Sequence, residues 1–492
     1  MTIKLSETEF LAVIYALSFA FLISVPYLIE YPVGDEFAYV KQARLLLEGK
    51  TQPNWLQSTS YLTLLAGMPI IQNSFSFVSL RMMMILISAI SAPLMYMILR
   101  ELNAKRSIAA LSAFVLITSP FVAVHLRQFI TEPISLPLYL LAILLIVKGM
   151  KTGKGVFFLS ATVVSILGFL NKQIDIIPAM AAFLFLSIHG IRLLPIKSLQ
   201  KIFLESLGLG KHLFLKNFNK NLLLIGISVV FALAFFLYNV ITTGYILAPT
   251  TIPSTVTPDA PYAPQFGIKP THNAFRVIQD IIFIGFMFLP FGLYIKNAGQ
   301  KIIVLASVAI ALLAALSGKP FIFHSNPILV FVTSALFAYS GLNLALYIFR
   351  NRRESAVMNF SFIALVGCVI FTILKINIFL LKYYMIFLPF ILIFLANSIK
   401  SRIPYVVTIL ILGGFGFFLT VNDINHHEKV WSEVNNLLSS GVSPNDIDGH
   451  PTVVSWFNDL TDNINAHYKI VIKPDSVFYN FVDVDSIEIR KT

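Results

Sequence analysis

The chain has 492 residues, of which 57% are hydrophobic and only 12% are charged. A soluble domain carries roughly 25% charged residues, so this composition excludes an ordinary soluble protein and indicates one that crosses a membrane many times. The net charge of +12 does not indicate nucleic-acid binding, because the basic residues lie in short runs between apolar segments, where they set the orientation of the spans.

The first apolar segment, residues 10–29, is too long for the core of a signal peptide and is predicted to be a retained span. The stretch that follows it, Glu30 to Lys50, contains the adjacent acids Asp35 and Glu36. Because a charge at the bilayer centre costs ~3 kcal/mol on insertion scales, we expect these acids in a wet cavity at the interface and interpret the stretch as an active-site loop. The alternative is that they only cap a helix, since acids favour helix N-termini.

Two interfacial helices are predicted in this first outer loop. The residues after Glu36 follow a helical period, with an apolar stripe and a charged side, which is typical of a helix that lies along the membrane surface. The run from Tyr61 to Ile71 is apolar but short, and Gly67 and Pro69 interrupt it. It is therefore predicted to be a second interfacial helix and not a span.

Segments of about 20 apolar residues predict about thirteen transmembrane helices. They lie near residues 10–29, 78–99, 107–125, 130–148, 155–171, 174–192, 221–243, 276–295, 302–317, 328–349, 356–374, 383–399 and 404–421. With a cytoplasmic N-terminus, the inner segments hold 20 of the 36 Lys and Arg residues but only five of the 24 Asp and Glu residues. This excess is the positive-inside pattern, so we predict an integral protein of the plasma membrane or the ER in that orientation.

Charges of both signs gather in the outer turns, which are too short to form a domain. Ionisable groups at the ends of spans are candidates for a functional site. The candidates in these turns are Arg127, Glu132, Lys172, Gln173, Asp175, Lys382 and Tyr383. Each has a structural alternative: Arg127 and Arg81 can pair with nearby acids, Glu132 can start a helix, and the lysines can simply extend to the interface.

The composition changes after Thr420, where acids and aromatic residues become frequent. Residues 468–491 alternate as strands do, with a Pro-Asp turn between them. We predict a transmembrane domain over residues 1–421 and a small extracytoplasmic α+β appendage over residues 422–492. The single cysteine, Cys368, excludes an intrachain disulfide and a cysteine metal site.

Carboxylates and cations on the outer face, without a glycine-rich nucleotide loop, indicate a phosphate substrate carried on a lipid. With a polyprenyl-phosphate sugar, a carboxylate can deprotonate the acceptor hydroxyl as it attacks C1, while Lys or Arg neutralises the departing phosphate. A cation can replace a divalent metal here, because a monophosphate carries less charge than a diphosphate. No cofactor is assigned, and a divalent metal stays an open alternative.

The layout resembles the GT-C superfamily of membrane glycosyltransferases, with its acidic first outer loop, interfacial helices, second acidic turn and outer C-terminal domain. The order of motifs is similar to that of the dolichyl-phosphate-glucose α-1,2-glucosyltransferase family, and the protein O-mannosyltransferase and aminoarabinose transferase families share the plan. The sequence segments that carry this resemblance are GDEFAYVKQARLLLEGK at 34–50, RQFITEPIS at 127–135, NKQIDII at 171–177 and LKYYMIFLPF at 381–390.

The resemblance implies roles for the matching residues. Asp35 would be the general base, Glu36 would orient it or bind the acceptor or a metal, and Glu132 would bind the acceptor, the sugar or a metal. The residues implied in donor-phosphate binding are Arg127, Lys172, Gln173, Lys382 and Tyr383. Lys172 and Lys382 stand where relatives carry Arg, which keeps the charge but loses the bidentate fork.

The function implied is inverting transfer of a sugar from a polyprenyl (dolichyl)-phosphate donor to a glycan, lipid or protein acceptor on the extracytoplasmic face. The expected partners are these substrates and membrane lipid, without nucleic acid. The alternative is a multi-span transporter or flippase, which would carry charges through the depth of the bilayer. The centres of the predicted spans are nearly uncharged, and this favours the enzyme.

Overall fold

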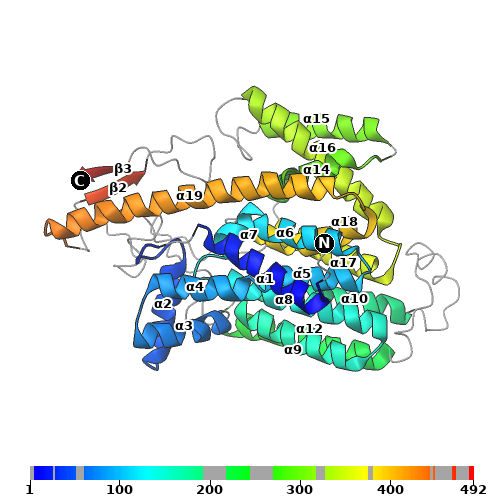
Figure 1. Ribbon diagram of the computed structural model, residues 1–492, viewed down its shortest axis with the longest axis horizontal. Coiled ribbons are helices and arrows are strands. Elements are labelled where there is room, and N and C mark those ends of the chain that lie inside the picture. The colour runs from blue at the N-terminus through cyan, green and yellow to red at the C-terminus, as the bar shows by residue number, and fades with distance from the viewer. Residues whose placement is uncertain are drawn as a thin grey trace.

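The computed structural model describes residues 5–25, 28–50, 60–191, 218–243, 270–297, 299–316, 327–374 and 381–443, and the short segments 447–448, 468–472 and 487–491. These ranges are almost entirely helical (Figure 1). The helices are α1 (Glu7–Ile23), α2 (Glu36–Leu47), α3 (Tyr61–Asn73), α4 (Phe77–Ser88), α5 (Ser91–Glu101), α6 (Arg106–Thr118), α7 (Pro120–His125), α8 (Glu132–Thr152), α9 (Gly155–Asn171), η2 (Gln173–Ile176), α10 (Ile177–Ile191), α12 (Phe218–Thr243), α13 (Pro270–Met287), α14 (Leu289–Tyr294), α15 (Gln300–Leu316), α16 (Pro327–Asn351), α17 (Ala356–Leu374), η4 (Leu381–Ile386), α18 (Leu388–Ser398) and α19 (Ile403–Ser439).

The chain is a helical membrane protein with several spans. Within the described ranges, six helical segments are long and apolar enough to cross a membrane. They are Phe77–Glu101, Glu132–Thr152, Lys220–Tyr238, Ile328–Asn351, Ala356–Ile373 and Ile403–Ser439. A helix overlaps every predicted span, but several are short or broken: α6 ends at Thr118 and α7 begins at Pro120, and α13 ends just before α14. The count of thirteen crossings therefore stays a prediction.

The core of the bundle surrounds α8, which is apolar on all sides, as expected for a helix enclosed by others. Its apolar window is 78% buried, the highest share among the candidate spans. Side chains from α1, α5, α6, α10, α17 and α18 join those of α8 in one continuous hydrophobic cluster. The N-terminus of α8, at Glu132, is consequently a fixed point at one end of the bundle.

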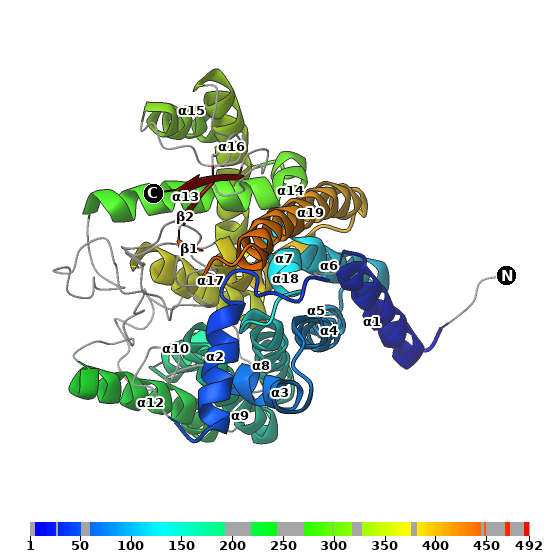
Figure 2. The same ribbon diagram turned by 90° about the vertical axis from the view of Figure 1, so that its left-hand side faces the viewer.

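The two helices predicted to be interfacial are present as α2 and α3, and they lie together at one end of the molecule (Figures 1 and 2). Val40 and Ala43 of α2 are fully buried, and they pack in one cluster with Leu64 of α3, Leu80 of α4 and Phe129. This second core fixes the first outer loop against the turn that leads into α8.

The last helix, α19, contains 37 residues. At 1.5 Å per residue it is about 55 Å long, whereas the hydrocarbon core of a bilayer is about 30 Å thick. Its first half is apolar and its second half, from about residue 422, is polar, so the helix continues well beyond the span predicted at 404–421. The predicted domain boundary at residues 421 and 422 lies in the middle of this helix, where the chain makes no break.

Three short strands follow α19: β1 (Ile447–Asp448), β2 (Tyr468–Ile472) and β3 (Ile487–Lys491). β1 is parallel to β2, and β2 is antiparallel to β3 with Ile470 opposite Ile489. Most residues between these strands lie outside the described ranges. The α+β appendage and its limits at 422–492 therefore stay a prediction.

A buried acid lies near the start of the predicted span at residues 276–295. Asp280 of α13 is only 3% exposed, and its carboxylate accepts hydrogen bonds from the hydroxyl groups of Tyr384 (2.8 Å) and Thr372 (2.5 Å). The ring of Tyr384 also stacks on Phe283 of α13. Asp280 thus ties α13 and α17 to η4, and its buried charge is compensated by hydrogen bonds.

The contact between α13 and α16 depends on glycine. A Cβ atom at Gly285 would overlap the carbonyl oxygen of Phe337, and a Cβ at Gly341 would overlap that of Ile281. We predict that Gly285→Ala destabilises the bundle by about 1–3 kcal/mol or more, because backbone cannot move aside as a side chain can. Thermal unfolding in detergent measures this.

The matched control is Gly414→Ala in α19, where an added Cβ meets no atom within 4 Å. This exchange should leave the melting temperature unchanged or raise it slightly, because alanine favours the helix. Equal melting temperatures for the two variants would contradict the close contact of α13 with α16.

Candidate active site

The loop before α2 presents its two acids in opposite ways. Gly34 adopts a left-handed φ of +54°, which favours glycine, and the chain then enters α2. Asp35 is exposed at the N-cap position of α2, whereas the next residue, Glu36, is fully buried. Successive helical residues point about 100° apart, so one acid faces inward while the other stays accessible.

Glu36 is held by a buried ion pair with Arg81 of α4. The distance between Arg81 Nη2 and Glu36 Oε2 is 2.5 Å, and Arg81 Nε donates to Oε1 at 2.9 Å. The backbone N–H groups of Val33 and Phe129 also donate to the carboxylate, at 2.8 and 2.7 Å. The Glu36 carboxylate therefore joins its own loop, α4 and the turn before α8.

Arg81 also binds the part of the same loop that precedes Glu36. It is 1% exposed, and its two terminal nitrogens donate to the carbonyl oxygens of Ile29 (2.5 Å) and Tyr31 (2.6 Å). The structural pairing considered for Arg81 is thus confirmed. Glu30 fixes the loop once more, because its carboxylate accepts hydrogen bonds from Ser76 Oγ and the Phe77 N–H at the start of α4.

Glu132 and Lys172 form a second ion pair, with 2.6 Å between Lys172 Nζ and Glu132 Oε1. Glu132 is the first residue of α8 and is fully buried, while Lys172 follows the end of α9 and keeps 13% of its side chain exposed. Thr131 Oγ1 donates to the other oxygen of Glu132 at 3.1 Å. The structure brings together these two residues, which the sequence placed in separate turns.

Asn171 positions this pair. Its Oδ1 accepts from both the N–H and the hydroxyl of Thr63, and its Nδ2 donates to the Thr131 carbonyl and to Ser135 Oγ. One side chain therefore joins α3, α8 and α9. Sequence reasoning placed Asn171 in the correct turn but gave it no role, because nothing local indicates that a single amide will meet three helices.

Asp175, a candidate to which the sequence gave no specific role, is a further acid near the pair. It lies in η2, only 3% exposed, and its carbon atoms contact the position a Cβ of Gly168 would take. The Oδ2 atom is buried without a hydrogen-bond partner in the structure. Its place in the motif NKQIDII was the available signal.

Arg127 is buried among helix carbonyl groups, and its role in donor-phosphate binding stays a prediction. Its guanidinium is fully buried and donates to the carbonyl oxygens of Leu22 (2.7 Å), Phe21 (2.9 Å) and Ala123 (2.7 Å) and to Thr420 Oγ1 (3.2 Å). The carbonyl groups at a helix C-terminus attract cations. Arg127 therefore caps α1 and connects it to α7 and α19.

The remaining predicted residues are described only in part. Gln173 is half-buried at the start of η2, directly after Lys172. Lys382 and Tyr383 lie in η4, and their side chains fall outside the described residues. The backbone of η4 is fixed by the neighbouring Tyr384 through Asp280.

No metal centre is evident in the described part of the chain, where no group of three or more His, Cys, Asp or Glu side chains could hold an ion. Two acids, Glu132 and Asp175, both interact electrostatically with Lys172. The contacts do not assign a metal to them.

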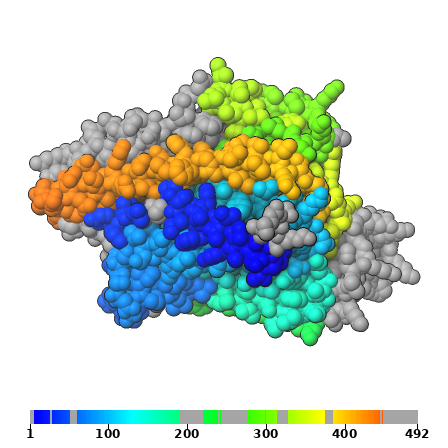
Figure 3. All heavy atoms as spheres, in the orientation of Figure 1, coloured from blue at the N-terminus to red at the C-terminus, as the bar shows by residue number. Residues whose placement is uncertain are grey.

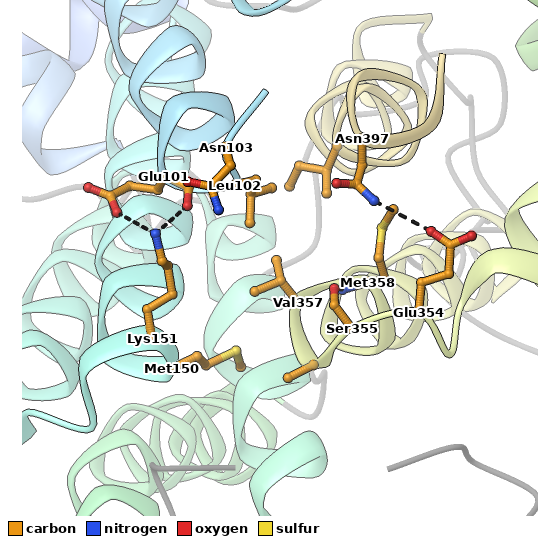
Figure 4. Close-up of a pocket in the computed structure, with 12 residues that line it drawn as sticks. Glu101, Leu102, Asn103, Met150, Lys151, Glu354, Ser355, Val357, Met358 and Asn397 are labelled. Carbon is orange, nitrogen blue, oxygen red and sulfur yellow. Dashed lines mark hydrogen bonds and ion pairs between the residues drawn. The ribbon is translucent and has the colours of Figure 1, made fainter. Parts of the chain in front are cut away.

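A pocket of about 480 Å³ lies elsewhere, between the ends of α5, α8, α17 and α18 (Figure 4). Glu101 pairs with Lys151 on one side of it, and Asn397 contacts Glu354 on the other. Glu101 is the last residue of α5 and Lys151 lies at the end of α8, whereas Glu132 is the first residue of α8. The pocket is therefore separate from the candidate site.

The buried pair predicts a stability effect. We expect Arg81→Met to destabilise the protein by about 3–5 kcal/mol, because it leaves Glu36 charged and buried without its partner. The double variant Glu36→Gln/Arg81→Met should lose less than the sum of the single losses, since glutamine can still accept one of the two backbone hydrogen bonds and leaves no buried charge. Melting temperatures in detergent measure both effects.

The control is Lys50→Met, which breaks an exposed ion pair with Glu48 and should leave the melting temperature unchanged. Strictly additive losses for Glu36→Gln and Arg81→Met would contradict the coupling.

Comparison with known proteins shows which families and structures the chain is similar to. Residues 60–209 match the family model of dolichyl-phosphate-mannose-protein mannosyltransferases. That segment contains Glu132 and Lys172 but begins after Asp35. The mannosyltransferases are one of the families that the layout resembles, alongside the glucosyltransferases. No match was found among curated protein sequences.

Among solved structures, ArnT from Cupriavidus metallidurans bound to undecaprenyl phosphate is similar at a TM-score of 0.38 and 11% identity, over 92% of this chain and 85% of that one. AglB from Archaeoglobus fulgidus, in complex with an inhibitory peptide and a dolichol-phosphate, has a TM-score of 0.32 and 15% identity, over 82% of this chain and 56% of that one. The family match covers less than half of the chain, so it shows a likeness to this family of membrane mannosyltransferases over residues 60–209.

Proposed function

We propose that the chain transfers a sugar with inversion from a polyprenyl phosphate to a hydroxyl acceptor on the extracytoplasmic face, with Asp35 as the general base. The observation that carries this proposal is the contrast between two adjacent acids. Glu36 is buried and paired with Arg81, whereas Asp35 is exposed at the start of α2. A base that must meet a substrate has to be accessible and rigidly held, and the buried neighbour supplies the rigidity.

In the proposed reaction, the acceptor oxygen forms a bond with C1 of the sugar as the bond between C1 and the phosphate oxygen breaks. The Asp35 carboxylate takes the proton of the acceptor hydroxyl. The phosphate leaves with the electron pair and gains a negative charge, which a nearby cation stabilises. In this proposal Glu36 is a positioning residue, because its oxygens are occupied by Arg81 and backbone N–H groups.

Lys172 is the proposed cation for the departing phosphate. Its ammonium is fixed by Glu132 at 2.6 Å and remains partly exposed, so it can contact a ligand without first being ordered. The turn that contains Glu132 also contains Phe129, whose N–H donates to Glu36. This connection links the two ion pairs through the four residues from Phe129 to Glu132 and supports a shared site. Gln173, Lys382 and Tyr383 stay candidates for the same phosphate.

The extracytoplasmic placement rests on charge. The segments assigned to the cytoplasm hold 20 of the 36 basic residues, and Asp35, Glu132 and Lys172 fall on the other side of that topology. The acceptor can be a glycan, a lipid or a protein.

The central test is Asp35→Asn, which keeps the shape of the side chain but removes its basicity. We expect transfer to fall by about 10²–10⁴-fold, the usual contribution of a general base. The measurement is the consumption of labelled dolichyl-phosphate-mannose and dolichyl-phosphate-glucose by membranes that contain the protein.

The control is Glu48→Gln, at an exposed acid directly after α2, which should retain full activity. Equal amounts of protein in the membrane are required for both variants. Full activity of the Asp35→Asn variant with both donors would remove Asp35 from the reaction.

A second test separates the two cations. Lys172→Gln should lower transfer by about tenfold or more and raise the KM for the donor, because a charged contact to phosphate is lost. Arg127→Gln should instead lower the melting temperature while the folded fraction keeps the KM of the parent protein. The reverse pattern would assign the phosphate to Arg127.

A further inference from the structure

The polar half of α19 contacts the loop that precedes Asp35, although almost 400 residues separate them in sequence. The ring of Tyr31 stacks on Trp431 with 4.6 Å between centroids, and Trp431 Nε1 donates to the carbonyl oxygen of Pro32 at 3.1 Å. The hydroxyl of Tyr31 donates to Asn435 Oδ1 at 2.9 Å. Figure 3 shows the outer end of α19 lying against the N-terminal segment.

These contacts form a small hydrophobic core of their own. Trp431 is 2% exposed, and with Val430, Val434 and Leu437 it packs against Ile29, Tyr31 and Ile447. The burial of a tryptophan and several aliphatic side chains is sufficient to hold α19 against the loop without help from any polar contact.

His427 adds a polar contact one helical turn earlier. It is 6% exposed, and its Nε2 accepts a hydrogen bond from the N–H of Gly34 at 3.4 Å. Its Nδ1 faces the carbonyl oxygen of Asp423 at 2.9 Å. A neutral imidazole has one donor and one acceptor nitrogen, so this arrangement requires the proton on Nδ1. Asp423 thus orients the ring, and Nε2 binds the loop.

From these contacts we propose that the polar half of α19 is part of the active site and that His427 is a positioning residue for Asp35. The inference rests on the proposed function, in which Asp35 is the base. Gly34 immediately precedes Asp35, and its left-handed backbone sets the direction in which the acid leaves the loop. His427 binds the N–H of Gly34, the residue directly before Asp35.

The loop is consequently held from two sides. On one side Arg81 and Glu30 bind it to α4, through the carbonyl groups of Ile29 and Tyr31 and the N-terminus of α4. On the other side α19 binds Tyr31, Pro32 and Gly34. A displacement of about 1 Å in a catalytic group can cost 10²-fold in rate, so a contact that adds little stability can still affect catalysis strongly.

The test compares isosteric replacements of the imidazole. In His427→Gln the carboxamide occupies the position of Nε2 and can accept from the Gly34 N–H, whereas in His427→Asn it occupies the position of Nδ1 and does not reach the loop. We expect the glutamine variant to retain transfer within about twofold. The asparagine variant and His427→Ala should lose about tenfold or more in kcat, with little change in the KM for the donor.

Transfer is measured with labelled dolichyl-phosphate-mannose and dolichyl-phosphate-glucose in membranes, together with protein amount and the melting temperature in detergent. Glu428→Ala, an exposed neighbour on α19, is the matched control and should behave as the parent protein. Asp35→Asn is assayed beside these variants.

The outcomes distinguish failure of the positioning role of His427 from failure of the proposed function. Rescue by glutamine but not by asparagine, at equal melting temperature, supports the positioning role. Normal activity of all three His427 variants overturns it while an inactive Asp35→Asn leaves the proposed function intact. Equal losses in the glutamine and asparagine variants, or losses that follow the melting temperature, also overturn it. An active Asp35→Asn variant overturns both.

Discussion

The buried ion pair of Glu36 and Arg81 is the constraint on which the candidate site depends. Two opposite charges at about 1% exposure are costly to remove from water, and they persist because every strong partner is supplied: two backbone N–H groups for the carboxylate and two carbonyl groups for the guanidinium. The partners come from the first loop, α4 and the turn before α8. Breaking the pair would therefore disturb all three elements, and with them the position of Asp35.

Buried and accessible charged residues have different roles in this arrangement. In the first loop, one acid is buried and structural and its neighbour is accessible. In the turns between spans, Arg127 is buried against helix carbonyls while Lys172 stays partly exposed beside Glu132. The buried members set the geometry and the accessible members are the candidates for chemistry. This arrangement suits a transferase, whose reacting groups must be held firmly but must still meet a lipid-borne substrate.

The long helix α19 connects the transmembrane bundle to the loop that precedes α2. Thr420, at the end of its apolar half, accepts from Arg127, and the following turns contact the loop through His427 and Trp431. Because an α-helix is a stiff rod, the last span and the first outer loop are fixed relative to each other. A chain that ended at the membrane surface would lack this restraint.

The sequence by itself determined the class of protein, the positions of the apolar helices, the two interfacial helices and the segments in which the candidate residues lie, because hydropathy and helical period are local properties. It also identified the acids of the first loop and the turns of Glu132 and Lys172. Only the tertiary structure decided which partner each charge takes. It paired Glu36 with Arg81 and Lys172 with Glu132, assigned Arg127 to the end of α1, and brought α19 to the first loop. Such pairings depend on contacts between residues 40 to 400 positions apart, which no local pattern contains, and on a continuous helix across residue 421, where composition alone indicated a boundary.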